Sequence, residues 1–415
     1  MSIIIDGNSG ISTAGGTPIV NTTSNPSSLG TVTSITSIGN VSVTGVGSGI
    51  AYPDASLQTT VGYTGFRNRI INGAMVIDQR NSGASGTASN YTVDRWGYGA
   101  TQASKGTWGR NLNSVTPPAG FTNYLGFQSS SAYSVGASDV FYIYQGIEGY
   151  NYADLAYGTV NAKTTTFSFW VYSSLTGVFG GAYQNSGGSR TYPFSYTIPA
   201  ANTWTYITVT IPGDTTGTWN TTNGAANYVN FSLGAGSTYS GSANAWSGSF
   251  YWQPTGSTSV VGTSGATFYI TGVQLEKGSV ATPFEFRQFG TELALCQRYF
   301  ETSFPIGTAP ANSSASASNY NGTELSSVGL YVAVCLKVSK RATPSVVIYS
   351  GNNAASPTAN QLQFYNNAGS GWTNTTGATA AATNDNSFYV SATTSGTTAG
   401  YSYFTTFGWT ASAEL

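Results

Sequence analysis

The chain has 415 residues, of which only 7% are charged, and its formal net charge is −1. A typical soluble domain has about 25% charged residues, so hydroxyl, amide and glycine groups must cover most of this surface. A chain so close to neutral has no electrostatic attraction to DNA, RNA or an anionic membrane, and we expect no nucleic-acid partner. The sequence contains no histidine, which excludes Ser-His-Asp catalysis, Cys-His catalysis and histidine-ligated metal sites.

The composition predicts an all-β protein. Its 52 glycines weigh against long helices, whereas 14% aromatic and 40% hydrophobic residues are too many for a disordered chain. The length exceeds that of one typical domain. We expect an N-terminal fibrous oligomerisation segment at 1–66, a jelly-roll β-sandwich at 67–287, a short helical linker at 288–303 and a small C-terminal β domain at 304–415.

The N-terminal segment consists of short pieces in which apolar and hydroxyl side chains alternate, such as 31–35 and 41–46. This alternation predicts strands with one apolar face. The segment has few large apolar residues, so its strands need a partner surface from other copies of the chain, and we interpret it as an oligomeric shaft. A flexible linker is the alternative. The first residues lack the basic and apolar regions of a signal peptide, and no run reaches the roughly 18 apolar residues of a membrane helix, so we expect no membrane insertion.

Residues 67–287 show strand patterns at regular spacing with turn residues between them, which is typical of a β-sandwich or jelly roll. In the first clear pattern, Phe167, Phe169 and Val171 alternate with hydroxyl side chains, although Trp170 and Tyr172 make the second face partly aromatic. The strands are predicted at 166–172, 206–211, 228–233 and 267–275.

A short helix and a second group of strands follow. The near-helical spacing of Leu293, Leu295, Cys296 and Tyr299 predicts a helix of about two to three turns within 290–300, with Thr291 as its N-cap. Further strands are predicted at 328–338, 345–349, 362–365, 387–392 and 402–407. Because this second β domain follows the linker, we place it at the distal tip.

The two cysteines, Cys296 and Cys335, are too few for a disulfide-stapled scaffold. We interpret both as reduced, small core residues, with a disulfide between them as the alternative. Two thiols cannot complete an all-cysteine zinc site, and the sequence has no EF-hand or Asp-rich repeat. We therefore expect neither a metal nor a cofactor.

Five segments resemble those of bacteriophage tail fibres and receptor-binding proteins. They are residues 66–80, 91–96, 145–157, 272–300 and 407–415. The resemblance implies a homotrimer that attaches through its N-terminal segment to other tail or baseplate proteins and binds the host surface. It also implies location in the virion after synthesis in the host cytoplasm. It does not imply a particular receptor.

A second resemblance concerns the approach to the 206–211 strand. Asn202-Thr203-Trp204 before this strand is similar to carbohydrate-binding jelly rolls, in which an equivalent tryptophan packs beneath a sheet. The resemblance supports the jelly-roll fold more than it supports a ligand, because one fold hosts many functions.

Catalysis without histidine would require a glycosidase pair of acids about 5–10 Å apart, one of them desolvated. Glu148 and Asp154 form the nearest acidic cluster, beside Tyr150, Tyr152 and Tyr157, which could make an aromatic platform for a sugar. The same segment is also typical of a tight loop leading into a strand, with Asp154 as a turn or cap residue. We favour this structural interpretation.

The acidic residues near Trp96 are interpreted in the same way. Asp78, Asp94 and Arg95 indicate a buried ion pair or a turn anchor rather than a catalytic set. The chain also lacks the recurring coil-length period of a tailspike β-helix. We expect no enzymatic activity, and a lone carboxylate pair is the alternative.

Binding is the stronger hypothesis, because neutral sugars are recognised by aromatic faces together with amide and hydroxyl groups. Residues 239–253 place several such side chains among small residues that cannot bury them all. The candidates there are Tyr239, Asn244, Trp246, Tyr251, Trp252 and Gln253. In the alternative interpretation, Phe250 and Trp252 point into the sandwich core while Tyr251 points outward.

The C-terminal domain offers a second group of aromatic residues among Asn, Ser and Gly. Its members are Tyr320, Tyr365, Trp372, Tyr401, Tyr403 and Trp409. Trp372 and Tyr401 are the candidates for sugar binding in this domain. The alternative for each residue is packing between the subunits of a trimer.

These observations predict a phage tail fibre that binds a host-surface glycan or protein without catalysis. One alternative is a structural virion component, such as a head fibre or decoration protein, in which the aromatic residues only hold the oligomer together. Another is a secreted carbohydrate-binding module, which the missing signal peptide and catalytic domain disfavour.

Overall fold

The computed structural model divides the chain into two units, Met1–Gly62 and Tyr63–Leu415. It describes residues 3–6, 10–13, 18–20, 50–51, 57–58, 66–326, 329–356, 358–366, 371–382 and 384–415. The described parts of the first unit are an antiparallel sheet of β1 (Ile3–Asp6), β2 (Gly10–Thr13) and β3 (Pro18–Val20), and a pair of β4 (Ile50–Ala51) and β5 (Leu57–Gln58). The shaft strands predicted at 31–35 and 41–46 lie outside the described residues.

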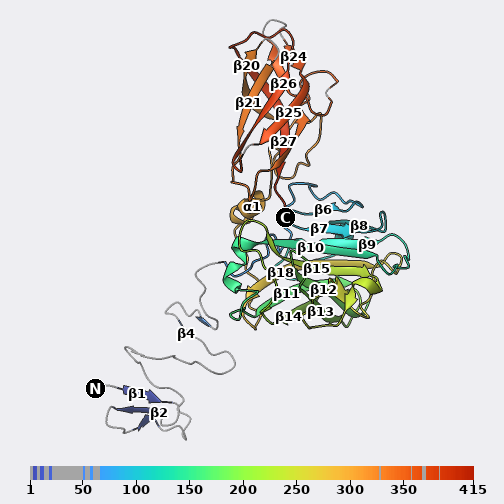
Figure 1. Ribbon diagram of the computed structural model, residues 1–415, viewed down its shortest axis with the longest axis vertical. Coiled ribbons are helices and arrows are strands. Elements are labelled where there is room, and N and C mark those ends of the chain that lie inside the picture. Colours follow the sequence, from blue (N-terminus) through green and yellow to red (C-terminus); the bar gives the residue numbers. More distant parts are fainter. Residues whose placement is uncertain are drawn as a thin grey trace. The chain divides into compact units, whose positions relative to one another are not determined.

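The second unit begins with a sandwich of two antiparallel sheets (Figure 1). One sheet has the order β13 (Thr191–Ile198), β12 (Gly177–Asn185), β15 (Ala225–Ala235), β10 (Val140–Glu148), β7 (Gly97–Ala100) and β6 (Asn90–Tyr91). The other has the order β14 (Thr205–Ile211), β11 (Thr165–Ser173), β18 (Thr267–Lys277), β9 (Leu125–Ser129) and β8 (Gly106–Arg110). The predicted all-β, jelly-roll-like architecture is confirmed.

Short elements connect these strands. They are the parallel pair β16 (Ser240–Gly241) and β17 (Gln253–Pro254) and the 3-10 helices η1 (Leu112–Ser114), η2 (Gly149–Asn151), η3 (Ala153–Leu155) and η4 (Ser237–Tyr239). None of the described helices is long and apolar enough to cross a membrane.

An aromatic core fills the sandwich. Phe167, Phe169 and Val171 alternate along β11 and are fully buried, as the period-two pattern predicts. Phe231 from β15 in the opposite sheet packs its ring 5.5 Å from that of Phe167 and 4.9 Å from that of Phe169. The two sheets are therefore held together by interlocking aromatic rings, which bury more apolar area per residue than aliphatic side chains do.

The C-terminal residues form a nine-stranded antiparallel sheet with a core of its own. Its main path has the order β24 (Gly371–Asn374), β23 (Gln363–Asn366), β27 (Ser402–Ser412), β20 (Ser318–Ser326), β21 (Gly329–Cys335), β26 (Ser387–Thr393) and β25 (Thr376–Ala382), and β19 (Phe300–Thr302) and β22 (Ser345–Ser350) also pair with β27. Trp409 and Phe388 meet edge to face in the core, with ring centroids 5.2 Å apart. The five strands predicted here are all present.

The structure corrects the interpretation of one cysteine. Cys296 is fully buried, as predicted, and burial raises the pKa of its thiol well above the usual value. Cys335 is exposed, because it alternates with the inward-facing Val334 at the end of β21. Both thiols are free, so the alternative of a disulfide is wrong.

The predicted linker contains one helix, α1 (Phe289–Gln297), followed by β19. The predicted N-cap is wrong, since the N-cap position is Gln288 and Thr291 lies within the first turn. Glu292, in that turn, accepts a hydrogen bond from the backbone of Asn72 and pairs with Arg287. A carboxylate in the first turn also interacts favourably with the helix dipole.

A buried charge cluster connects the sandwich to the end of β27. Arg95 is 1% exposed and pairs with Glu414, which also pairs with Arg80 at 2.6 Å. The second guanidinium nitrogen of Arg95 donates to the carbonyl of Gly146 in β10, and the guanidinium lies over the ring of Tyr299 at 3.6 Å. We refer to Arg80, Arg95 and Glu414, together with the Glu148 and Arg298 pair described below, as the joint.

This arrangement refines the prediction for the acidic residues near Trp96. Asp78 is a turn anchor, since its carboxylate accepts from the backbone nitrogens of Asn81 and Gly83. Asp94 accepts two hydrogen bonds from Gln79, and burial raises its pKa to about 6. Arg95 pairs with neither of them. Its partner, Glu414, lies 319 residues away in the sequence, so no local pattern could have identified it.

The second part of the joint uses the carboxylate considered for catalysis. Glu148 is 1% exposed, accepts from Arg298 at 2.8 Å and accepts from the hydroxyl of Tyr299 at 2.7 Å. Nearby, the side-chain amide of Gln145 bonds both backbone groups of Ile71. The segments 66–80, 91–96, 145–157, 272–300 and 407–415 therefore contribute to one region, in which they bind one another.

We expect Glu414→Gln to lower the free energy of unfolding by about 3–5 kcal/mol, because it leaves the buried Arg95 without its anion. Asp154→Asn is the matched control, because it removes the ion pair between Asp154 and Arg69. The Asp154 side chain is 54% exposed, so this substitution should cost at most about 1 kcal/mol. Urea denaturation of both variants measures the difference. Equal costs would show that the joint is not a main source of stability.

Candidate functional site

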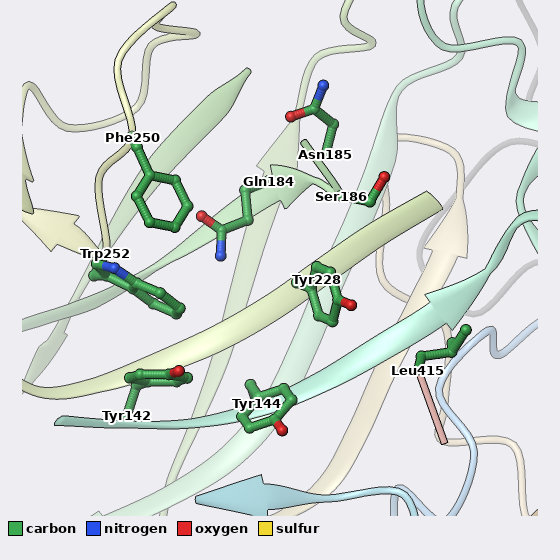
Figure 2. A pocket seen from close by; sticks show the side chains of 9 residues that line it. All are labelled: Tyr142, Tyr144, Gln184, Asn185, Ser186, Tyr228, Phe250, Trp252 and Leu415. Carbon is green, nitrogen blue, oxygen red and sulfur yellow. The ribbon is translucent and has the colours of Figure 1, made fainter. Parts of the chain in front are cut away.

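A pocket of about 250 Å³ lies on the face of the six-stranded sheet that points away from the sandwich core. Its lining comes from β10, β12 and β15, from the loop before β17, and from the end of the chain (Figure 2). The lining residues are Tyr142, Tyr144, Gln184, Asn185, Ser186, Tyr228, Phe250, Trp252 and Leu415. Four of these nine side chains are tyrosine or tryptophan rings with a polar edge, a lining suited to a ligand that has both apolar and hydroxyl surfaces.

Glycines on the neighbouring strand allow two of the tyrosine rings to lie across the sheet. Tyr142 of β10 stands opposite Gly99 of β7, and Tyr144 stands opposite Gly97. A Cβ atom at either glycine would overlap the ring of the tyrosine opposite it. The Gly-Tyr-Gly run at 97–99 thus provides the space in which both rings lie flat, while Tyr98 between them points into the core.

The same pairing occurs on the other side of β10. Tyr228 of β15 stands opposite Gly146, and a Cβ at Gly146 would come within 2.9 Å of the Tyr228 ring and 3.1 Å of Leu415. Gly146 also accepts the hydrogen bond from Arg95. Gly146 therefore lies between Arg95 of the joint and the two residues, Tyr228 and Leu415, that line one end of the pocket.

Trp252 forms one wall of the pocket. Its ring stacks on Tyr142, with centroids 3.9 Å apart and an angle of 29° between the planes. Phe250 meets Trp252 edge to face at 5.2 Å and is 39% exposed. The backbone nitrogen of Trp252 donates to the carbonyl of Tyr239, which fixes the loop that carries both rings.

Gln184 supplies the polar group at the centre of the pocket. Figure 2 shows its amide between Phe250, Trp252 and Tyr228. The side chain is 3% exposed, yet its Oε1 atom has no hydrogen-bond partner. A buried acceptor without a partner costs about 1–3 kcal/mol, and few such groups occur in folded proteins. A ligand that donates a hydrogen bond to this atom, once the amide turns toward the pocket, would recover this cost.

The neighbouring amide is already used within the protein. Asn185 donates from Nδ2 to Ser189 and to the carbonyl of Thr218, and its Oδ1 accepts from the backbone of Arg190. These bonds hold the turn between β12 and β13. Of the two amides that line the pocket, only that of Gln184 has an acceptor left open.

No lining side chain of the pocket carries a charge at neutral pH. Burial raises the pKa of Tyr142 to about 12 and raises the pKa values of Tyr144 and Tyr228 as well. All three hydroxyl groups therefore stay protonated and can donate hydrogen bonds throughout the physiological range. The lining side chains provide apolar surface and neutral hydrogen-bonding groups.

The structure places the sequence-predicted candidates of 239–253 in different surroundings. Trp252 lines the pocket, and Tyr239 supports it by packing edge to face against Phe250 at 6.2 Å. Gln253 is 5% exposed and bonds Ser232 and the carbonyl of Ala235 inside the protein. Tyr251 covers Gly241 of β16 and does not line the pocket.

The remaining candidates in this loop lie beyond the pocket. Trp246 packs against Trp219 at 5.7 Å and donates from Nε1 to the carbonyl of Pro212, so it belongs to the edge of the core. Asn244 has a positive φ of 57° and bonds Ser195. Both residues shape the loop that ends in Phe250 and Trp252.

The two C-terminal candidates are not brought together with the pocket. Trp372 packs 5.8 Å from both Tyr365 and Phe404 on the C-terminal sheet. Tyr401 is 62% exposed, in the turn before β27. Trp409, from the same group of aromatic residues, is buried and donates from Nε1 to the hydroxyl of Tyr320.

Sequence reasoning missed Tyr142, Tyr144, Tyr228 and Gln184. A signal for two of them was present, because Tyr142 and Tyr144 alternate with the core residues of 140–148, and the glycines of 97–99 repeat with the same period of two. What the sequence lacked was the information that β7 and β10 are neighbours. Gln184 gives no signal, because its role depends on an absent hydrogen bond.

The carboxylates considered for catalysis do not line the pocket. Glu148 is held in the joint, and Asp154, in η3, pairs with Arg69 at 2.8 Å. Trp204, predicted from the jelly-roll resemblance to pack beneath a sheet, packs on the outer face of the five-stranded sheet against Tyr124 and Tyr172. Among the residues that the structure describes, no group of three His, Cys, Asp or Glu side chains is placed to hold a metal ion.

Comparison with known proteins gave only distant similarities. No family model matches the chain, and no curated protein matches it. Among solved structures, the chain is similar to the enzymatically active domain of tailspike protein 4 from bacteriophage CBA120, with 14% identity and a TM-score of 0.29. The similarity covers 51% of this chain and 21% of the tailspike chain, so it spans about a fifth of that protein.

Two further solved structures are similar over about half of this chain. A putative sugar-binding protein from Bacteroides thetaiotaomicron has 13% identity and a TM-score of 0.30, with 51% of this chain and 100% of that chain covered. A family 11 carbohydrate-binding module from Clostridium thermocellum, in complex with a mixed-linked tetrasaccharide, has 10% identity and a TM-score of 0.24, with 48% and 98% covered. Similarities this low transfer neither a ligand nor an activity, so the function is argued from the pocket.

We expect Gly99→Ala to displace the Tyr142 ring and to destabilise the sandwich by about 1–3 kcal/mol through overpacking. Gly371→Ala in β24 is the matched control, because no atom of the residues that the structure describes lies within 4 Å of its Cβ position. Near-UV circular dichroism reports the Tyr142–Trp252 stack, and urea denaturation reports the stability. An unchanged spectrum in Gly99→Ala would contradict the proposed role of the glycine.

Proposed function

We propose that this protein is a phage tail fibre that binds a host-surface glycan in the pocket on the six-stranded sheet, without catalysis. The observation that carries the binding proposal is the stack of Trp252 on Tyr142 beside the unpaired Gln184 amide. Sugars present flat C–H faces to aromatic rings and hydroxyl groups to amides. This combination of an apolar wall and a neutral polar centre matches both surfaces of a sugar.

The volume of the pocket limits what it can hold. Pockets for drug-sized ligands measure about 300–1,000 Å³, and this pocket is smaller, at about 250 Å³. It therefore suits one sugar unit of a glycan, with the rest of the glycan outside. The uncharged lining supports a neutral sugar over an acidic one, because an anion would lose its hydration without gaining a cationic partner.

The proposal of a virion role rests on the segments that resemble tail fibres. In the structure these segments form the joint, which connects the sandwich, α1 and the end of β27. On this proposal, the N-terminal segment attaches a homotrimer to other tail or baseplate proteins, and the second unit contacts the host. The protein is then a component of the virion that is made in the host cytoplasm.

The absence of catalysis is part of the proposal. Cleavage of a glycosidic bond requires an acid and a second carboxylate on opposite sides of the bond. Neither Asp nor Glu occurs among the residues that line the pocket. Binding without cleavage is the function that this lining supports.

The test is binding of fluorescently labelled full-length protein to host cells before and after periodate oxidation of their surface sugars. We expect periodate to abolish binding, and Trp252→Ala to weaken it about tenfold or more through loss of the stacking surface. Tyr206→Ala is the matched control, since Tyr206 is a 44% exposed aromatic residue on the other sheet.

Three other results would contradict parts of this proposal. Binding that survives periodate would indicate a protein receptor. Binding that is lost in Tyr206→Ala but kept in Trp252→Ala would move the site to the five-stranded sheet. A failure to bind a verified host would favour a structural virion component, such as a head fibre or decoration protein.

A further inference from the structure

The open acceptor of Gln184 lies among aromatic rings. Its Oε1 atom is buried without a hydrogen-bond partner, and Phe250, Trp252 and Tyr228 surround the amide (Figure 2). Gln184 stands opposite Tyr228 in the ladder between β12 and β15, so the sheet fixes its position. A ligand group that fits here must offer an N–H or O–H donor and must also cover apolar ring surface.

We infer that the pocket takes the acetamido group of an N-acetylated sugar, an inference that rests on the proposed glycan-binding function. The acetamido N–H donates to Gln184 Oε1, and the methyl group packs against the rings of Phe250 and Trp252. The acetamido carbonyl faces the protonated tyrosine hydroxyls of the lining, which donate hydrogen bonds. One substituent therefore satisfies the buried acceptor and covers the apolar walls.

Other sugar substituents fit this lining less well. A hydroxyl group could donate to Gln184, but it carries no methyl group of its own to add to the apolar contact that the sugar ring makes. A free amino group would be charged, and no Asp or Glu side chain lines the pocket to pair with it. A carboxylate would lack a cationic partner and would face the Oε1 acceptor. The acetamido group is the common substituent that avoids all of these costs.

The test uses saturation-transfer NMR on the full-length protein with four probes: the methyl β-glycosides of N-acetylglucosamine, N-acetylgalactosamine, glucose and galactose. We expect at least one N-acetylated probe to bind about tenfold or more tightly than its parent hexose. Its acetyl methyl protons should receive the strongest saturation, because they contact the rings. Gln184→Met, which keeps the shape of the side chain but removes the acceptor, should lower the affinity of that probe about tenfold and abolish its advantage over the parent hexose.

Different failures separate the two proposals. If both classes of probe bind equally and Trp252→Ala removes their binding, the acetamido inference is overturned while the glycan site stands. If binding of all probes persists in Trp252→Ala, or if no probe binds, both the inference and the site are overturned. Should Gln184→Met fail to fold, the saturation pattern of the acetyl methyl group in the unchanged protein still decides, since weak saturation of that group overturns the inference.

Discussion

The buried ion pair of Arg95 and Glu414 is the interaction on which the rest of the second unit depends. A chain with so few charges places both of these side chains almost out of contact with water, at 1% and 6% exposed, and such burial is costly unless each charge is paired. Here the cost is offset by Arg80 on the same carboxylate and by the carbonyl of Gly146. The pair connects the sandwich to the residues that follow β27, although 319 positions separate its members.

The joint and the pocket share one strand. β10 carries Tyr142 and Tyr144 near its start, Gly146 in its second half and Glu148 at its end. Glu148 accepts a hydrogen bond from Arg298, which follows α1. The carbonyl of Gly146 accepts one from Arg95, and Gly146 stands opposite Tyr228, which lines the pocket. The charged residues that bind the end of β27 therefore also bind β10, the strand that carries Tyr142 and Tyr144 of the pocket. A strand held in this way needs less ordering when a ligand binds, which would lower the entropic cost of binding.

The sequence predicted features that depend on local periodicity. The alternation of Phe167, Phe169 and Val171 identified β11 and its buried face, and the apolar spacing around Cys296 identified α1. The burial of Cys335 was predicted wrongly, because a two-fold pattern does not say which face of a strand is covered. The partner of Arg95 was not predictable, since ion pairs between distant segments leave no local signal.

The pocket residues also divide into those with a local sequence signal and those that depend on the arrangement of distant strands. Trp252 was found from composition, because a large ring among small residues suggests a surface role. The cross-strand pairs of Tyr142 and Gly99 required the order of strands in the sheet, and the open acceptor of Gln184 required its hydrogen bonds. A residue such as Gln184, whose proposed role depends on a missing hydrogen-bond partner, is the hardest kind to find in a sequence.

The most direct test of a sugar site in this pocket is a crystal structure of the protein in complex with glycan fragments. The fragments are released from the surface of cells that the protein binds, and they are co-crystallised with it. The account predicts electron density for one sugar unit against Trp252, with a substituent within hydrogen-bonding distance of Gln184 Oε1. Density for a sugar at the C-terminal sheet or on the five-stranded sheet, with this pocket empty, would contradict it.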